Sequence, residues 1–342
     1  MTKKYNVAVV GATGMVGQKM IQVLQERRFP INRLKLLASA RSVDLKIQVG
    51  GQEYSVEEAV PASFEGVDFA FFSAGEAVSR ELAPEAVKRG AIVIDNSNAF
   101  RLEEKVPLVV PEVNPEAAFK HNGLIANPNC STIQMVVALQ PLHRAAGLKR
   151  VVAATYQAVS GAGREAVEEL FNQCRAVLEG REATCEYIPH KGAARHYQLA
   201  FNLVPQLDVF VEDDYTKEEM KMVYETRKIM GIPDLAITAT TVRVPVANGH
   251  SEVLNIEFQN PITPQEAREV LEKAPGVVVR DDPAQLIYPM PLDADGRDEV
   301  YVGRIRRDRS VPYGLNLWVV ADNIRKGAAT NSIQIAELLL QG

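Results

Sequence analysis

The sequence predicts an α/β protein with two domains, the first built on a parallel sheet and the second an α+β domain with a mixed or antiparallel sheet. Its 342 residues exceed what one hydrophobic core usually serves. Short apolar runs alternate with helical patterns over the first 130 residues, which is typical of crossover connections between parallel strands. From about residue 148, strand patterns cluster with long helical patterns instead.

Each element is predicted from its hydrophobic period and its bounding turn residues. The chain begins with a β-branched run at 5–10, a glycine-rich turn and a helical pattern that starts near residue 15. The further strands are expected at 34–38, 67–73, 91–95, 151–157, 238–245, 252–259 and 315–321. The further helices are expected at 79–89, 133–142, 164–179, 216–230 and 330–340.

The composition excludes several classes of protein. Hydrophobic residues make up 46%, enough to build a core, so the chain is neither disordered nor collagen-like. A net charge of −5 argues against binding to nucleic acid or an anionic membrane, so a small anionic ligand would need a local cluster of cations. Three cysteines are too few for a disulfide framework, and neither a membrane-spanning run nor a signal peptide is evident. These features predict a cytoplasmic protein.

A glycine-rich turn lies between the first strand and the first helix. It reads Gly11-Ala-Thr13-Gly14-Met15-Val16-Gly17, a variant of the turn that binds dinucleotides. Glycines allow the backbone to approach a pyrophosphate, which then rests on the helix N-terminus. The position of this turn at the first strand–helix junction predicts a Rossmann-like domain.

The residues after the second strand bear on the choice between NAD and NADP. Enzymes that use NAD usually carry an acidic residue there, but this stretch has Arg41 and Ser42 and no carboxylate until Asp44. An arginine beside a small hydroxyl suits a 2′-phosphate. We therefore expect NADP, with an ordinary surface arginine as the alternative.

Cys130 lies in the segment Asn127-Pro-Asn-Cys-Ser-Thr-Ile-Gln134, just before an apolar helical pattern. The turn and cap residues ahead of it place the thiol at a helix N-terminus, where the dipole and unpaired N–H groups stabilise a thiolate. The alternative is a small buried hydrophobic residue, which is how Cys174 and Cys185 are interpreted.

A thiol nucleophile calls for a proton-transfer partner, and His250 is the candidate among five histidines. It follows a strand and a glycine, seven residues after Arg243. A structural role remains the alternative, and for His143, late in the helix after Cys130, that role is expected.

Five segments occur in a fixed order along the chain: GATGMVG, NPNCSTIQ, YQAVSGAG, EEMKM and RVPVANGHSE. Together they resemble the aspartate-semialdehyde dehydrogenase family in its bacterial form, over essentially the whole chain. The glycine turn alone is a weak motif, but the joint occurrence is highly specific. Asn98 departs from the serine expected in the family, which affects only the detail of its loop.

The resemblance implies a role for each matching residue. It makes Cys130 the acyl-thioester nucleophile, His250 the general acid/base and Gln157 the residue that orients the substrate. Arg243 would bind the substrate α-carboxylate and Glu218 would face its α-amino group. Arg101 and Lys221 would bind phosphate. The matching cofactor positions are Thr13, Gly14, Met15, Val16, Arg41, Ser42, Ser160, Gly161 and Asn323; no metal is implied.

The implied reaction converts L-aspartyl 4-phosphate, NADPH and a proton into L-aspartate 4-semialdehyde, NADP⁺ and phosphate, toward lysine, threonine, methionine and diaminopimelate. The resemblance also implies a homodimer able to associate further. Residues 1–129 and 324–342 would form the Rossmann-like NADP-binding domain, and 130–323 the catalytic and dimerisation domain.

Structural roles for these residues, and other functions for the protein, remain as alternatives. Arg101 and Lys221 could be solvated charges, Glu218–Lys221 an i,i+3 helical pair, and Gln157 a polar residue at a strand edge. Another acyl-phosphate reductase, such as N-acetyl-glutamyl-phosphate reductase, is the alternative enzyme. A cofactor-binding regulatory protein without catalysis is the alternative from another class.

Overall fold

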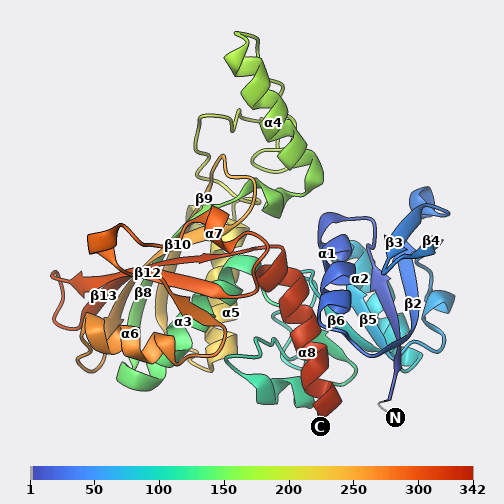
Figure 1. Ribbon diagram of the computed structural model, residues 1–342, viewed down its shortest axis with the longest axis horizontal. Helices are drawn as coiled ribbons and strands as arrows, with labels where there is room; N and C mark the ends of the chain where they lie inside the picture. Colours follow the sequence, from blue (N-terminus) through green and yellow to red (C-terminus); the bar gives the residue numbers. More distant parts are fainter. Residues whose placement is uncertain (1–2, 342) are drawn as a thin grey trace. The chain divides into compact units, whose positions relative to one another are not determined.

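The computed structural model describes residues 3–341 and divides the chain into two compact units (Figure 1). One unit consists of Met1–Asn129 and Ala328–Gly342, and the other is Cys130–Gly327. The second break falls within a short π-helix, Arg325–Ala329, rather than at residue 324. No helix among residues 3–341 is long and apolar enough to cross a membrane.

The first unit contains a seven-stranded sheet in the order β3-β4-β2-β1-β5-β6-β7, parallel except for the β3–β4 pair. Its strands are β1 Tyr5–Val10, β2 Ile31–Ala38, β3 Lys46–Val49, β4 Gln52–Glu58, β5 Phe69–Phe72, β6 Ile92–Asp95 and β7 Leu124–Ala126. Its helices are α1 Met15–Glu26, α2 Glu76–Lys88 and α8 Thr330–Gln341. The predicted alternation and parallel pairing are therefore confirmed.

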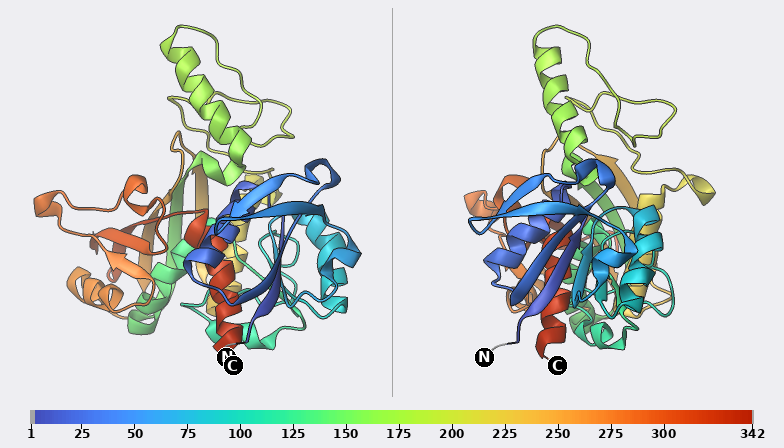
Figure 2. Two further views of the ribbon diagram at one scale, coloured as in Figure 1. Left: turned by 45° about the vertical axis from the view of Figure 1, so that its right-hand side comes forward. Right: turned by 90° about the vertical axis from the view of Figure 1, so that its right-hand side faces the viewer.

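The β3–β4 hairpin was not predicted, although its turn carries a sequence signal. Gly50 and Gly51 connect the strands with φ values of +60° and +81°, a left-handed conformation that favours glycine. The hairpin extends the sheet beyond β2, as Figure 2 shows. β7 was also missed, because three residues are too few to show a period.

The C-terminal helix α8 belongs to the first unit because of what it buries. Ile333, Ile335 and Ala336 are fully buried in one cluster with Val9 of β1 and Met20 of α1. Burial of apolar side chains against the sheet is the main stabilising contribution here. This packing explains why the last residues of the chain join the first domain.

The second unit contains a six-stranded sheet in the order β11-β12-β13-β10-β8-β9. Its strands are β8 Leu148–Gln157, β9 Ala236–Arg243, β10 His250–Phe258, β11 Val277–Val279, β12 Val300–Asp308 and β13 Gly314–Ala321. Its helices are α3 Cys130–Ala146, α4 Arg164–Leu178, α5 Lys217–Met230, α6 Pro264–Glu272 and α7 Pro291–Ala294. The β8–β9 and β11–β12 pairs are parallel and the other pairs antiparallel, so the sheet is mixed. The sequence interpretation had missed α6, α7, β11 and β12.

Helix α4 and the chain that follows it project from this sheet (Figures 1 and 2). The projection has a small hydrophobic cluster of its own, including Ala166 and Leu170 of α4 and Ile188, Leu199 and Val204 of the following segment. The projection is therefore a packed subdomain, even though the segment 179–211 has little regular secondary structure.

The strand directions place one end of each of four strands, β8, β9, β10 and β13, on the same side of the second sheet. Strands β8 and β9 end together, with Gln157 opposite Arg243. Strand β10 runs antiparallel to β8 and starts at the same edge with His250, which pairs with Ala321 at the end of β13. We call this the site edge.

Candidate functional site

His250 is the first residue of β10, and its side chain is completely buried at the site edge. The strand begins two residues earlier than the sequence predicts, so a strand rather than a loop holds the imidazole. Gly249 ahead of it has φ +89° and would place a side chain 3.1 Å from Pro291. Its N–H donates to Asn323 Oδ1 at 3.0 Å, which fixes the turn.

The backbone of Ala158 fixes both the orientation and the tautomer of His250. The Ala158 N–H donates to Nδ1 at 3.0 Å, so the neutral ring carries its proton on Nε2. Nε2 is buried and has no hydrogen-bond partner among the described residues. Burial and the nearby Arg243 charge lower the pKa of His250 from 6.5 to about 3. The imidazole therefore faces the site as a neutral donor.

Arg243, the last residue of β9, is buried beside His250. Its Nη1 donates to the Ala158 carbonyl at 2.6 Å, while Nε has no hydrogen-bond partner among residues 3–341. Burial lowers the pKa of this arginine, and the charges of Glu218 and Cys130 partly offset that effect. A β-carbon at Gly161 would lie 3.0 Å from Arg243 Nη1 and 3.3 Å from His250 Nε2. A side chain at 161 would therefore fill the space in front of both groups.

Gln157 and Glu218 form a hydrogen-bonded pair that joins β8 to α5. Gln157 Nε2 donates to Glu218 Oε1 at 3.2 Å, and both side chains are buried. Helix α5 is held there by a capping box, in which Thr216 accepts from the Glu219 N–H and Glu219 accepts from the Thr216 N–H. Glu219 also accepts from the Thr241 N–H of β9 at 2.9 Å.

Lys221 pairs with two carboxylates, Glu218 and Asp208, each at 3.0 Å. The i,i+3 ion pair between Glu218 and Lys221, which was the structural alternative, is thus present. The pair is nevertheless part of the site, because Glu218 also bonds Gln157. Asp208 had no signal in the sequence, since it lies in a segment without periodicity.

Cys130 is the first residue of α3, as the sequence predicts. Gly327 lies directly against it: a β-carbon there would be 2.8 Å from Cys130 Cβ. Cys130 also acts on the pKa of Arg243, which places the sulfur within electrostatic reach of the arginine. The second unit therefore brings together Cys130, Gln157, Glu218, Arg243 and His250.

A small polar cluster beside this group contains two of the expected cofactor residues. Ser160, in a 3-10 helix at Val159–Ala162, hydrogen-bonds both Asn248 and Asn323. Asn323 also accepts the hydrogen bond from Gly249 that fixes the backbone before His250. The sequence did not predict a role for Asn248 or for the backbone of Ala158. Any residue type can supply a backbone N–H, so Ala158 had no signal in the sequence. Asn248 did have one, because it directly precedes Gly249 and His250.

The glycine turn in the first unit has the shape that a dinucleotide needs. A β-carbon at Gly17 would lie 2.1 Å from the Gly11 carbonyl, and Gly11 has φ +84°. Helix α1 has no side-chain cap at Gly14 and no acidic residue in its first turn. Its N–H groups can therefore receive a phosphate group, so the turn fits the expected cofactor.

Arg41 and Ser42 form a short 3-10 helix, Ala40–Ser42, directly after β2. β1 and β2 are parallel neighbours, and Gly11 N–H donates to the Leu37 carbonyl at 2.8 Å, so the glycine turn and Arg41 lie at the same sheet edge. Arg41 is exposed and makes no ion pair within the described chain. Its guanidinium is thus available at the expected position.

Arg101 also belongs to the first unit and is buried in the loop after β6. Its Nη2 donates to the Asn96 carbonyl at 2.7 Å. Asp95 anchors the loop by accepting from Ser97 and Ser79. Of the expected phosphate pair, Arg101 therefore lies in the first unit and Lys221 in the second.

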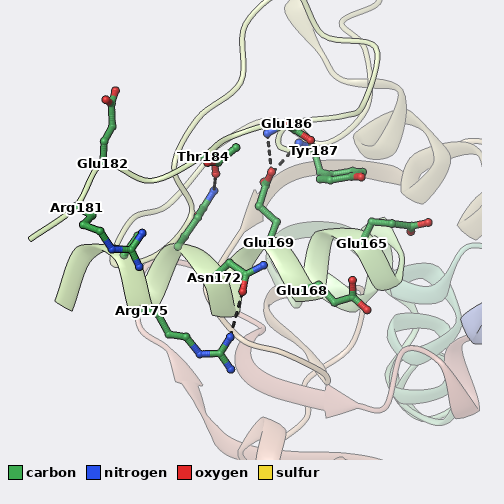
Figure 3. A pocket seen from close by; sticks show the side chains of 12 residues that line it. Glu165, Glu168, Glu169, Asn172, Arg175, Arg181, Glu182, Thr184, Glu186 and Tyr187 are labelled. Carbon is green, nitrogen blue, oxygen red and sulfur yellow. Dashed lines mark hydrogen bonds between the residues drawn. The ribbon is translucent and has the colours of Figure 1, made fainter. Parts of the chain in front are cut away.

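A groove of about 500 Å³ along α4 lies apart from these residues (Figure 3). Its walls are rich in glutamate, and none of the predicted site residues lines it. Glu169 accepts from the N–H groups of Glu186 and Tyr187, and Gln173 donates to the Thr184 carbonyl. The polar groups hold the subdomain together. Residues 3–341 contain no group of three or more His, Cys, Asp or Glu placed to hold a metal ion.

Two family models cover most of the chain. The family model described as semialdehyde dehydrogenase, NAD binding domain, matches residues 6–121, and the one described as semialdehyde dehydrogenase, dimerisation domain, matches 139–326. Aspartate-semialdehyde dehydrogenase of Bacillus subtilis (strain 168) is 56% identical over 340 residues, which are 99% of this chain and 98% of the relative.

Two solved structures share the fold. Aspartate semialdehyde dehydrogenase II of Vibrio cholerae, complexed with ASA, has a TM-score of 0.94 and 45% identity, with 99% of both chains covered. The Candida albicans enzyme with NADP has a TM-score of 0.75 and 26% identity, with 98% of both chains covered. The predicted family and two-domain fold are thereby confirmed, and the chain belongs to the aspartate-semialdehyde dehydrogenase family, whose members are oxidoreductases with a nicotinamide-cofactor domain.

Proposed function

We propose that this protein reduces L-aspartyl 4-phosphate with NADPH to L-aspartate 4-semialdehyde and phosphate, with Cys130 as nucleophile. The observation that carries the proposal is the constellation in the second unit. A thiol at a helix N-terminus shares a site with a buried arginine, a buried glutamate and a neutral imidazole donor. Membership of the family supports the same reaction.

The first chemical step is assigned to Cys130. Its thiolate attacks the acyl carbon, forms a carbon–sulfur bond and breaks the carbon–oxygen bond to phosphate. The phosphate leaves with the bonding electron pair and takes up one proton from solvent. The N-terminus of α3 favours the thiolate over the thiol, because its N–H groups and dipole stabilise negative charge.

His250 serves the step in which charge develops on the carbonyl oxygen. NADPH, when bound, supplies the hydride that reduces the thioester. The Nε2–H of His250 stabilises the resulting alkoxide by donating a hydrogen bond. The alkoxide then expels the Cys130 thiolate and becomes the aldehyde, so no base is needed in this direction. Nδ1 already accepts a hydrogen bond from the Ala158 N–H, so the proton on Nε2 is the one that can be donated. This supports the acid part of the proposed acid/base role.

Substrate recognition is assigned to two oppositely charged groups. Arg243 binds the α-carboxylate through its guanidinium, and Glu218 faces the α-ammonium. An acetylated amine carries no charge and would leave the buried Glu218 carboxylate without its cationic partner. This argues against N-acetyl-glutamyl phosphate as the substrate. Gln157 holds Glu218 in place, and Arg101 and Lys221 receive the phosphate.

NADP is the proposed form of the nicotinamide cofactor. The turn at Gly11–Gly17 would hold the pyrophosphate, and Arg41 with Ser42 would receive the 2′-phosphate. Ser160, Gly161 and Asn323 would line the nicotinamide end, since Gly161 lies against His250 and Asn323 bonds both Ser160 and the Gly249 N–H next to that histidine. The related enzyme solved with NADP supports this choice. We also propose the cytoplasm as its location, because none of the three cysteines is in a disulfide.

The second unit also supports a homodimer. Helix α3 packs on one face of its sheet. The other face carries Tyr156 and Trp318, whose rings lie 5.6 Å apart, and a groove of about 340 Å³ lined by Val253, Met290 and Trp318 among others. An aromatic, partly exposed sheet face suits a second copy of the chain. The matching family description names this domain for dimerisation.

The proposed function is tested in the oxidative direction. Purified protein is supplied with aspartate semialdehyde, phosphate and NADP⁺, and NADPH formation is followed. N-acetylglutamate semialdehyde serves as the competing substrate in a parallel assay. We expect turnover of the first substrate alone, dependent on phosphate; preference for the acetylated substrate would contradict the role of Glu218.

A further inference from the structure

Glu252 is a completely buried acidic residue that the proposed chemistry does not use. It lies on β10 two residues after His250, so both side chains project from the same face of the strand. Its cross-strand neighbours are Thr155 on β8 and Val319 on β13, neither of which carries a charge. Both carboxyl oxygens lack a hydrogen-bond partner of good geometry among the described residues.

Gln134 connects this region to the nucleophile. It lies one helical turn after Cys130 on α3, therefore on the same face of the helix, and is completely buried. Its Nε2 donates to the His250 carbonyl at 3.5 Å. Gln134 thus links the helix that carries the thiol to the strand that carries the imidazole. Its Oε1 is buried and has no hydrogen-bond partner within residues 3–341.

Protonation of Glu252 would allow the two unpartnered groups to satisfy each other. A carboxylate has acceptors alone, and so does the carbonyl oxygen of Gln134, so the two unpartnered groups cannot satisfy each other. A carboxylic acid has one O–H donor, which Gln134 Oε1 can accept. Turning the amide round would give the carboxylate a donor, but it would set two oxygens, Gln134 Oε1 and the His250 carbonyl, against each other.

The surrounding charges do not favour an ionised Glu252. The ionisable groups on the elements around it are His250 and Glu257 on its own strand, Cys130, His143 and Arg144 on α3, Lys149, Arg150 and Tyr156 on β8, and Lys326 in the π-helix beside Cys130. None of them shifts the pKa of Glu252. Burial raises that pKa well above its ordinary value, and the nearby Gln134 amide lowers it by less.

We propose that Glu252 is a positioning residue: its carboxyl group is protonated in the folded enzyme and donates a hydrogen bond to Gln134 Oε1. Gln134 Nε2 is then committed to the His250 carbonyl. The Glu252–Gln134 link holds the start of α3 and the start of β10 in a fixed register, which keeps Cys130 and His250 aligned. The proposal rests on the roles assigned above to those two residues, but the protonation of Glu252 can be tested without them.

Infrared spectroscopy of the intact protein at pH 7 tests the protonation directly. A protonated carboxylic acid absorbs above the amide I band, and Glu252→Gln removes that group. We expect the wild-type minus Glu252→Gln difference spectrum to contain this band. Glu257→Gln is the matched control, because Glu257 lies on the same strand and pairs with Lys149 at 2.6 Å; its difference spectrum should lack the band. A wild-type spectrum without the band overturns the proposal.

Kinetics test the positioning role. Glu252→Gln keeps a neutral donor and should retain kcat within about twofold, whereas Glu252→Ala should lower kcat by about tenfold with KM little changed, the cost of one unpaired buried polar group. Because Glu252 acts through Gln134, the double variant Glu252→Ala/Gln134→Ala should be no slower than Gln134→Ala alone. A tenfold loss in Glu252→Gln, or additive losses in the double variant, would contradict the role. If wild type itself lacks turnover, the proposed function fails, while the infrared result still stands.

Discussion

The site edge and the groove along α4 both contain buried polar side chains, yet they differ in how those groups are satisfied. In the α4 groove, Glu169 and Gln173 bond to backbone groups of the neighbouring segment. At the site edge, His250 Nε2 and Arg243 Nε are buried without partners in the described chain. The groove has a volume of about 500 Å³, but Glu169 and Gln173 in its wall serve to hold the subdomain together.

The comparison indicates that buried groups with unmet hydrogen-bonding capacity mark a candidate ligand site better than a groove whose charged groups hold the scaffold together. An unpaired buried donor costs stability, so it persists where a ligand supplies the missing partner. Carboxylates that accept two N–H groups are part of the scaffold.

Replacing Cys130 by alanine should lower the rate of phosphate-dependent aspartate semialdehyde oxidation by at least about 10⁴-fold, because the nucleophile is removed. NADP⁺ binding, measured by fluorescence titration, should persist. Cys174→Ala is the control, since Cys174 lies within α4. Substantial turnover in Cys130→Ala would overturn the thioester mechanism.

His250→Gln should lower kcat by about 10²- to 10³-fold, as expected for loss of one preorganised donor. Glutamine is chosen because its oxygen can still accept from the Ala158 N–H. His143→Gln provides the comparison, because His143 Nδ1 accepts from Leu148 N–H at the end of α3, a structural contact. Steady-state kinetics that show equal rates for both variants would remove His250 from the mechanism.

Arg41→Ala should reduce the preference for NADPH over NADH, measured as the ratio of kcat/KM, by about 10- to 100-fold. This corresponds to about 1.5–3 kcal/mol for lost charge-assisted hydrogen bonds. Arg33→Ala, an exposed residue of β2, should leave the ratio unchanged. A wild-type enzyme that already prefers NADH contradicts the assignment of Arg41.

The pKa of His250 also predicts how stability depends on pH. The folded chain keeps this group neutral down to about pH 3, whereas the unfolded chain takes up a proton below about 6.5. The His250 contribution is thus fully present above pH 6.5 and is lost as the pH falls toward 3. The loss is about 1.4 kcal/mol per pH unit in that window. Urea unfolding at several pH values should show a steeper decline for wild type than for His250→Gln; parallel curves would contradict the lowered pKa.

Glu169→Gln should have the smallest effect on catalysis and a moderate effect on folding. It weakens the acceptor for the Glu186 and Tyr187 N–H groups, so the free energy of unfolding should fall by about 1–2 kcal/mol. Values of kcat and KM should stay at wild-type levels. A change in kcat/KM would show that the α4 groove is coupled to the site, against the distinction drawn above.

Much of the fold followed from local pattern. Strand Tyr5–Val10 and helices α4 and α5 have bounds close to those predicted, because their periods are long and their caps distinct. The thiol at the start of α3 was predicted from Asn129 and Pro128 alone. In contrast, β12 and α6 were not predicted, although α6 begins with a complete capping box of Thr263 and Glu266, which is a local signal for a helix start.

The sequence by itself determined which reactive groups exist and where they lie within local elements: a glycine turn before a helix, a cysteine at a helix start, and an arginine and a histidine at strand ends. Local chemistry encodes these features, since caps, turns and periods involve residues within a few positions of one another. Only the tertiary structure decided the tautomer of His250, the pairing of Lys221 with Asp208 and the contact of Gln134 with the His250 carbonyl. Two of these contacts join a side chain to a backbone group 92 or 116 residues away, and the third joins α5 to an irregular segment, so no local pattern records which donor meets which acceptor.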